Sequence, residues 1–295
     1  MAKTATPSLA APIGAVVIAM ISVQAGASLA KGLFHTVGPL GATTLRVGFA
    51  AAMTLALWRP WRGPPLSWSR WPILAYGVVL GVMNMLFYQA LARVPLGIAV
   101  ALEFTGPLAV ATLSSRRLAD FVWVGLAVAG LLLLLPFGPL SSKLDPVGVL
   151  FALGAGLFWA LYIVFGKRAG AGGQGQAVGF GITIAAIVVA PLGVASAGPA
   201  LLAVAILPTA LLVALLTSVI PYSLEMVALT RLPAKTFGIL MSAEPAVGVL
   251  SGFLILGERL SVPQMLAIAL IITASAGAVF THGEAKPVPL ADIAG

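Results

Sequence analysis

The sequence contains no cysteine and only two histidines, and charged residues make up 8% of its 295 positions. Without cysteine the chain forms no disulfide bond and offers neither a thiolate nucleophile nor a sulfur ligand for a metal. The two histidines, His35 and His282, lie at opposite ends of the chain, which does not favour a shared metal site. We therefore expect neither a metal nor any other cofactor.

Catalytic motifs are missing as well. Neither H-E-x-x-H nor G-x-S-x-G occurs, and no pair of aspartates lies within an apolar segment. Metal-dependent and nucleophilic catalysis therefore have no obvious site in this chain. We expect a protein that is not an enzyme.

Apolar residues dominate what is present: they make up 60% of the chain, and the mean hydropathy is +1.10. A soluble domain carries about 25% charged residues, so 16 basic and 8 acidic side chains cannot cover so apolar a chain in water. The solvent must be lipid. The net charge of +8 would suggest nucleic acid in a soluble protein, but here we expect membrane lipid as the surroundings, no nucleic acid, and no obligate protein partner.

Ten stretches are long and apolar enough to cross a bilayer, which takes about 20 residues in a helix. We expect an all-α integral membrane protein of ten transmembrane helices. The expected spans are 13–33, 41–58, 72–92, 96–114, 121–137, 147–166, 177–195, 207–229, 236–256 and 264–281.

The loops between these spans carry their basic residues unevenly. One side receives eleven: Lys3, Arg59, Arg62, Arg70, Arg116, Arg117, Lys167, Arg168, Arg231, Lys235 and Lys286. The other side receives four: Lys31, Arg93, Lys143 and Arg259. Because cytoplasmic loops carry the excess of lysine and arginine, we expect both termini in the cytoplasm and an even number of spans.

A short pattern occurs twice in the chain. The segment ALARVP starts at residue 90 and ALTRLP starts at residue 228, an offset of 138 that also relates Pro107 to Pro245. Five spans fall in each half, and since five is odd, the second half enters the membrane from the opposite side. Inverted repeats of this kind enclose a central cavity in secondary transporters. The two five-helix repeats are expected at 13–138 and 146–282.

Polar residues inside the spans mark the expected cavity. A charge at the bilayer centre costs about 2.5–3.5 kcal/mol on insertion scales, so such residues normally face a cavity or a partner. Helical spacing of i, i+4 and i+7 places further polar residues on shared faces. The expected substrate-binding set is Glu103, Asn84, Tyr88, Gln24, Trp159, Tyr162, Tyr222 and Arg46.

Other interpretations of these residues stay open. The tyrosines and Trp159 also fit interfacial anchors, and Arg46 is close enough to the end of its span to extend to the surface. The three glutamates in spans, Glu103, Glu225 and Glu244, could instead pair with Arg46. Mid-span prolines remove helix hydrogen bonds and favour kinks beside these charges. The expected kink positions are Pro107, Pro221 and Pro245.

Three long runs resemble a known family. They are VPLGIAVALEFTGPLA from Val94, SSRRLADFVWVGLAV from Ser114 and PYSLEMVALTRLPAKTFGILMSAEPA from Pro221. They resemble the EamA-type branch of the drug/metabolite transporter superfamily and, within it, the threonine and homoserine exporters of the bacterial inner membrane. Looser similarity covers about residues 13–282. The resemblance implies ten helices, cytoplasmic termini, an inner-membrane location, a central pocket and amino-acid efflux coupled to proton antiport.

An amino-acid substrate would need partners for both of its charges in such a pocket. We expect Arg46 to face the carboxylate and Glu103 the ammonium group. A carboxyl group in an apolar cavity can exchange a proton near neutral pH, and we expect Glu225 or Glu244 to couple protons to transport. The first repeat has Gly106 where the second has Glu244, so a coupling role for this acid would rest on one half. The alternatives are an exporter of aromatic amino acids, a multidrug-type extruder and a facilitated-diffusion uniporter.

Overall fold

The computed structural model describes residues 10–63, 71–94, 96–113, 118–134, 145–241, 243–247 and 262–282. Within these ranges the chain is helical and contains no strand. The first half contains α1 (Ala10–Trp58), the 3-10 turn η1 (Pro60–Arg62), α2 (Trp71–Leu91), α3 (Leu96–Glu103), α4 (Thr105–Leu113) and α5 (Leu118–Leu134). The second half contains α6 (Pro146–Ala171), α7 (Gln174–Ala197), η3 (Gly198–Leu202), η4 (Val204–Ile206), α8 (Leu207–Ala214), a π-helical turn (Leu215–Val219), α9 (Ile220–Arg231), α10 (Ala234–Met241) and α12 (Val262–His282).

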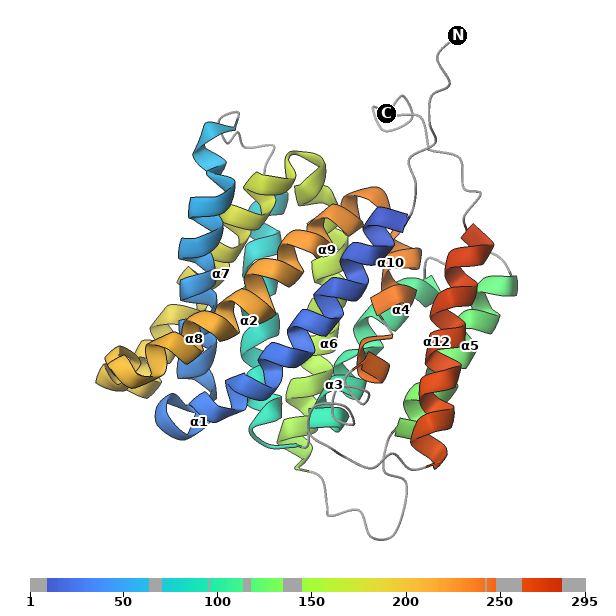
Figure 1. Cartoon of the computed structure of the whole chain (residues 1–295), viewed down its shortest axis with the longest axis horizontal. Helices are drawn as coiled ribbons and strands as arrows, with labels where there is room; N and C mark the ends of the chain where they lie inside the picture. Colours follow the sequence, from blue (N-terminus) through green and yellow to red (C-terminus); the bar gives the residue numbers. More distant parts are fainter. Residues whose placement is uncertain are drawn as a thin grey trace.

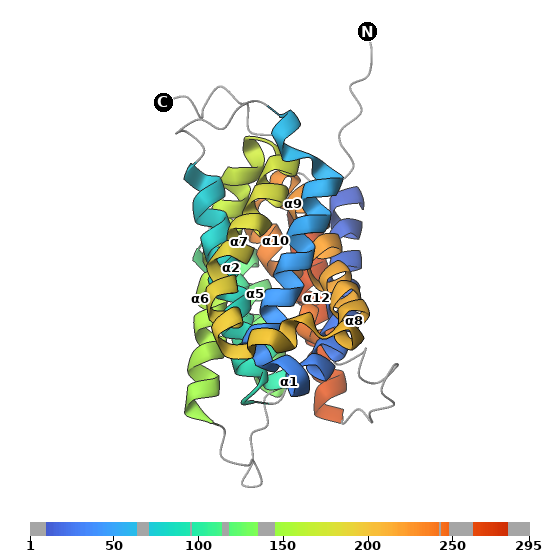
Figure 2. The ribbon, with the colours of Figure 1, turned by 90° about the vertical axis from the view of Figure 1, so that its left-hand side faces the viewer.

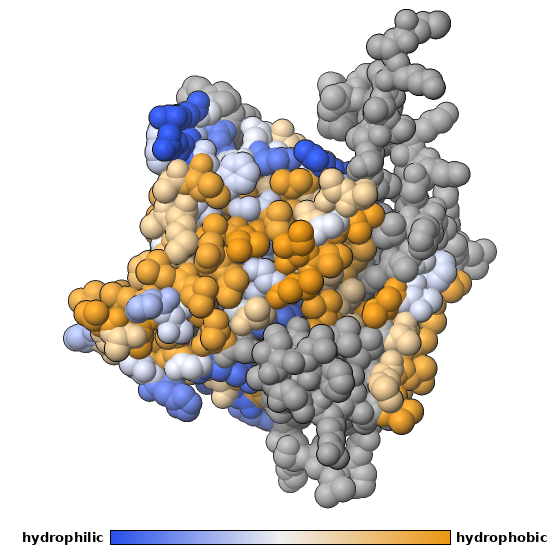
Figure 3. Space-filling view, viewed as in Figure 1, coloured by the Kyte–Doolittle hydropathy of each residue, from blue (hydrophilic) through white to orange (hydrophobic). Residues whose placement is uncertain are grey.

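The helices form a bundle with an apolar surface. Six helical segments of the described chain are long and apolar enough to cross a membrane: Ala10–Ala27, Leu29–Arg62, Trp71–Leu91, Pro146–Ala171, Gln174–Leu202 and Val204–Arg231. Apolar side chains cover the middle of the face in Figure 3, and hydrophilic ones gather at its upper and lower edges. Large apolar residues such as Leu150 and Ile187 are exposed, which lipid tolerates and water does not. The expectation of an all-α membrane protein is confirmed; the count of ten helices stays a prediction.

The first two expected spans are joined by a kink and not by a loop. Helical structure runs through α1, but Gly38 has non-helical dihedral angles (φ 66°, ψ 176°) and is followed by Pro39. A positive φ is accessible to glycine without steric penalty. The chain therefore reverses direction at a single residue, and the two halves of α1 lie as separate arms in Figures 1 and 2.

Three further expected spans are interrupted near their middles. The span at 96–114 is broken at Phe104 between α3 and α4, and the span at 207–229 contains the π turn. Part of the span at 236–256 lies outside the described residues, but it is broken by a turn at Ala243 before residues 244–247 resume a helix. Phe104 and Ala243 are 139 residues apart, close to the offset of 138 between the two copies of the sequence pattern.

Helices from the two halves of the chain pack against each other. α5 packs on α12 at one side of the bundle, α1 on α7, and α2 on both α6 and α7 (Figure 1). Glycines allow the close approach of α2 to α7. A Cβ atom added at Gly77 would lie 2.7 Å from the Gly181 carbonyl oxygen, and one added at Gly81 would lie 3.0 Å from the Ala185 carbonyl oxygen. These two glycines are therefore packing residues, as is common between membrane helices.

Candidate functional site

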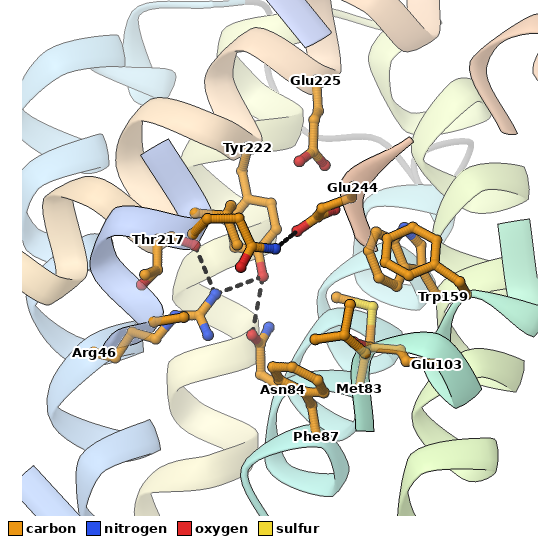
Figure 4. A pocket seen from close by; sticks show the side chains of 15 residues that line it. Arg46, Met83, Asn84, Phe87, Glu103, Trp159, Thr217, Tyr222, Glu225 and Glu244 are labelled. Atoms are coloured by element: carbon orange, nitrogen blue, oxygen red, sulfur yellow. Dashed lines mark hydrogen bonds between the residues drawn. The ribbon is translucent and has the colours of Figure 1, made fainter. Parts of the chain in front are cut away.

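A cavity lies where both arms of α1 meet α2, α3, α6, the π turn and α9 (Figure 4). It has about 50 Å³ of space for the centres of water-sized molecules, which is room for several waters or a small polar solute. We call it the Arg46 cavity. Its walls are formed by Val23, Gln24, Ala27, Arg46, Met83, Asn84, Phe87, Val100, Glu103, Phe104, Trp159, Thr217, Tyr222, Glu225 and Glu244.

Arg46 is buried and is held by neutral oxygen atoms. Its Nε donates to the Ser218 hydroxyl at 2.8 Å, and its Nη2 donates to the Thr217 carbonyl at 2.6 Å and to the Tyr222 hydroxyl at 3.1 Å. The guanidinium carbon lies 5.2 Å from the centre of the Tyr88 ring, within range of a cation–π interaction. Among the described residues no carboxylate lies within 4.0 Å of Arg46. The guanidinium is thus solvated by the protein without being neutralised, and it faces the cavity.

Tyr222 connects Arg46 to α2. Its hydroxyl accepts a hydrogen bond from Arg46 and donates one to Asn84 Oδ1 at 3.0 Å. The amide nitrogen of Asn84 donates in turn to the Leu80 carbonyl at 2.8 Å. Both polar atoms of the Asn84 side chain therefore have partners, which fixes the orientation of the amide and of the phenol.

Three carboxyl groups surround the same cavity, each no more than 5% exposed: Glu103, Glu225 and Glu244. Glu225 Oε2 accepts a hydrogen bond from the Tyr162 hydroxyl at 2.7 Å, and Glu244 Oε1 accepts one from Gln24 Nε2 at 3.4 Å. In Figure 4, Glu103 and Glu244 lie across the cavity from Arg46. One guanidinium cannot balance three ionised carboxylates in so buried a site. Protons or a cationic group of a ligand must supply the remaining positive charge.

Trp159 presents an unused hydrogen-bond donor. Its side chain is 7% exposed, and its ring packs against Phe104 with 4.8 Å between ring centres. The indole Nε1 has no hydrogen-bond partner in the described part of the chain. Buried donors without partners are rare in folded proteins and require an explanation. A bound molecule with an acceptor oxygen would provide one.

Most of the predicted polar residues come together here. The cavity is lined by Gln24, Arg46, Asn84, Glu103, Trp159, Tyr222, Glu225 and Glu244. Two predicted residues do not line it: Tyr88 lies over Arg46, and Tyr162 lies behind Glu225. Their roles, and those of the lining residues, stay predictions.

The three predicted kink prolines lie close to helix interruptions. Pro107 is in the first turn of α4 after the break at Phe104, and Pro221 is the second residue of α9 after the π turn. Pro245 is the second residue of the helical segment 244–247. Proline is tolerated in a first turn, where its missing N–H would have no helical partner. Pro107 and Pro245 therefore begin helical segments. Pro221 lies inside the helical run Val204–Arg231, where its missing N–H leaves a carbonyl of the π turn without a backbone donor.

The sequence did not reveal every part of the site. Apolar residues of the cavity wall, such as Met83, Phe87 and Phe104, cannot be distinguished in the sequence from ordinary packing residues. The Thr217 carbonyl was missed because a backbone group has no signal of its own. The one indication in the sequence is Pro221, four residues later. Because proline has no N–H, it cannot donate the usual helical hydrogen bond to the Thr217 carbonyl.

Comparisons with known proteins agree with this picture. Residues 146–280 match the sequence model of the EamA-like transporter family. The chain is 51% identical over 282 residues to the threonine/homoserine exporter RhtA of Escherichia coli strain K12, covering 96% of each chain. The RhtA protein of Salmonella typhimurium strain LT2 matches to the same extent. An uncharacterised transporter of Bacillus subtilis, YwfM, is 30% identical over 242 residues, covering 79% of this chain and 80% of that protein.

A solved crystal structure has the same fold. It superposes with a TM-score of 0.71 at 20% sequence identity and covers 92% of this chain and 99% of its own. At this identity the likeness concerns the fold alone.

Proposed function

Because the chain belongs to the EamA-like transporter family and functions in amino-acid efflux, we propose that it exports threonine and homoserine through the Arg46 cavity. The observation that carries this proposal is the identity of 51%, over nearly the full length of both chains, to proteins named threonine/homoserine exporters. These relatives are transporters, which also confirms the expectation that the protein is not an enzyme.

The charges of the Arg46 cavity suit an α-amino acid. Arg46 offers a planar set of N–H donors to the carboxylate, the geometry that guanidinium groups use for bidentate binding. Glu103 lies opposite (Figure 4) and suits the ammonium group. The unpartnered Trp159 Nε1 can donate to the side-chain hydroxyl of threonine or homoserine. Each charge and the hydroxyl of the substrate then has a partner in the cavity.

We further propose proton antiport, which the excess of carboxyl groups supports. Without substrate, protons are the simplest source of the positive charge that three buried acids and one arginine require. When the substrate ammonium enters, it takes over part of this charge and releases a proton. Glu225 and Glu244 are the coupling residues in this proposal, because Glu103 is assigned to the ammonium group. Alternating exposure of the cavity would then exchange protons for amino acid across the membrane.

The proposed architecture is ten transmembrane helices in two inverted five-helix repeats, at 13–138 and 146–282, with both termini in the cytoplasm of a bacterium and the protein in its inner membrane. Three observations support it. Helix breaks occur at corresponding positions, Phe104 and Ala243. Two helices made equivalent by the repeat, α5 and α12, pack on each other. The start of α1 and the end of α12 lie at the same end of the bundle in Figure 1, as an even number of crossings requires.

Reporter fusions test the topology. Fusions after Arg62, Arg116 and Lys167 should report the cytoplasm, because the positively charged loops stay inside. Fusions near Pro39 and Lys143 should report the periplasm. Alkaline phosphatase activity and green fluorescence, measured for each fusion, give opposite signals on the two sides. Termini found on opposite faces would contradict the ten-span proposal.

Efflux from proteoliposomes tests the substrate. Vesicles loaded with labelled threonine or homoserine should lose label in a saturable way, and vesicles loaded with phenylalanine or a lipophilic cation should not. Arg46→Gln should reduce threonine efflux at least tenfold, because the carboxylate loses its charged partner. Arg93→Gln is the matched control, since Arg93 is exposed and pairs with Asp145 outside the cavity; it should retain efflux. Loss of phenylalanine or the cation, with retention of threonine, would instead favour the aromatic or multidrug alternative.

The hydroxyl contact is tested by Trp159→Phe, which keeps a ring against Phe104 but removes the indole N–H. The preference for threonine over valine in efflux competition should fall about three- to tenfold, the usual effect of one lost hydrogen bond. Trp58→Phe is the control, because the Trp58 Nε1 donates to the Ser223 hydroxyl at 3.2 Å and Trp58 does not line the Arg46 cavity. An unchanged preference in Trp159→Phe would show that the hydroxyl is recognised elsewhere.

Coupling is tested by Glu225→Gln and Glu244→Gln, which keep the side-chain shape but cannot exchange a proton. A lower pH on the side of the membrane to which threonine is transported should drive threonine transport in the wild type. At least one of the two variants should lose this pH-driven transport about tenfold or more while still exchanging labelled for unlabelled threonine. Asp145→Asn is the control, because Asp145 caps α6 through the Val147 amide and lies outside the cavity. Normal pH-driven transport in both glutamine variants would favour facilitated diffusion.

A further inference from the structure

The π turn leaves its carbonyl groups short of backbone donors. The Ile220 amide donates to the Leu215 carbonyl, five residues back. Val219 is the N-cap of α9, so its carbonyl accepts the first α-helical bond, from residue 223. The carbonyls of residues 216, 217 and 218 therefore share only residues 221 and 222 as backbone donors. Pro221 has no N–H, so two of these three carbonyls depend on side chains.

Both missing donors come from α1. The Ser22 hydroxyl donates to the Leu216 carbonyl at 2.6 Å, and Arg46 Nη2 donates to the Thr217 carbonyl at 2.6 Å. With the amide of residue 222, three donors serve three carbonyls. The number of donors matches the number of carbonyls only while Arg46 remains hydrogen-bonded to the Thr217 carbonyl.

Arg46 cannot bind a carboxylate in bidentate fashion and keep all of its present bonds. Either bidentate geometry, end-on through Nη1 and Nη2 or side-on through Nε and Nη2, uses Nη2. The two hydrogens of Nη2 already serve the Thr217 carbonyl and the Tyr222 hydroxyl, and Figure 4 shows both bonds at the cavity wall. A carboxylate that binds Arg46 in bidentate fashion must therefore displace at least one of these acceptors.

We propose that the Thr217 carbonyl and the carboxylate of the transported amino acid compete for Arg46, with Ser22 and Pro221 as positioning residues that set the strength of this competition. The inference rests on the proposed function. When the carboxylate binds, Arg46 releases Thr217, and the π turn is left one donor short. Substrate binding thereby loosens the junction between α8 and α9, so that occupancy of the cavity is transmitted to the backbone of these helices.

Pro221→Ala tests the competition, because it adds one amide donor to the π turn. Four donors are then available to three carbonyls, so Arg46 can leave the Thr217 carbonyl without leaving any of the three unpaired. Threonine should bind about five- to tenfold more tightly to the purified variant in lipid nanodiscs, the effect of removing one competing hydrogen bond. Binding of 1-amino-2-propanol, which is threonine without its carboxylate, should not change. Alanine favours the helix more than proline does, so this variant should fold.

Ser22→Ala in the Pro221→Ala background tests whether the gain in affinity depends on the number of donors at the π turn. It removes one donor again, Arg46 is once more needed at Thr217, and threonine affinity should return to the wild-type value. Thr54→Ala in the same background is the matched control: Thr54 is a buried hydroxyl on α1 that donates to the Ala50 and Ala51 carbonyls of its own helix. It should leave the gain in affinity intact.

Three results would overturn the inference while leaving the proposed function in place. They are an unchanged threonine affinity in folded Pro221→Ala, an equal gain for 1-amino-2-propanol, or a gain that Ser22→Ala fails to reverse. Wild-type protein that binds no threonine would overturn the proposed substrate itself, and the inference with it.

Discussion

The burial of one permanently charged group constrains much of this structure. Arg46 stays protonated in any protein environment, and it is 5% exposed inside an apolar bundle. A charge in such a place needs oxygen ligands and polarisable neighbours. The π turn supplies a backbone carbonyl and a hydroxyl group, and α9 supplies the hydroxyl of Tyr222. The Tyr88 ring is the polarisable neighbour. The local irregularity of these helices is thus the condition under which the arginine can be buried.

Much of the fold and most of the site could be predicted from the sequence, for one physical reason. Lipid excludes polar side chains so strongly that any polar residue within a long apolar run has to face the interior. Arg46, Asn84 and the three glutamates could be assigned to the interior from the sequence alone on this ground. It also explains why helices occur in the described parts of all ten expected spans, since no other open structure satisfies the backbone in lipid.

The same reasoning could not locate the interruptions. Hydropathy measures side chains, and it assigns the same value to a continuous helix, to a kink at Gly38 and to the π turn (Leu215–Val219). These features depend on which backbone carbonyls find donors, and the donors lie far away in the chain, as Ser22 does from Leu216. Nor could helical spacing tell that Tyr162 lies behind Glu225 and does not line the cavity, because a helix face has a first and a second layer of side chains.

The kink at Gly38 gives the cavity a particular geometry. In a straight helix Ser22 and Arg46 would be about 36 Å apart, yet they bind the carbonyls of two consecutive residues. α1 is thus a pair of arms hinged at one glycine, and each arm carries one of the side chains that hold the π turn. Ser22 lies about 24 Å along its arm from the hinge, so a rotation of about 5° at Gly38 would move its hydroxyl by about 2 Å. The backbone angles of one residue therefore have enough leverage to make or break a hydrogen bond at the far end of the arm.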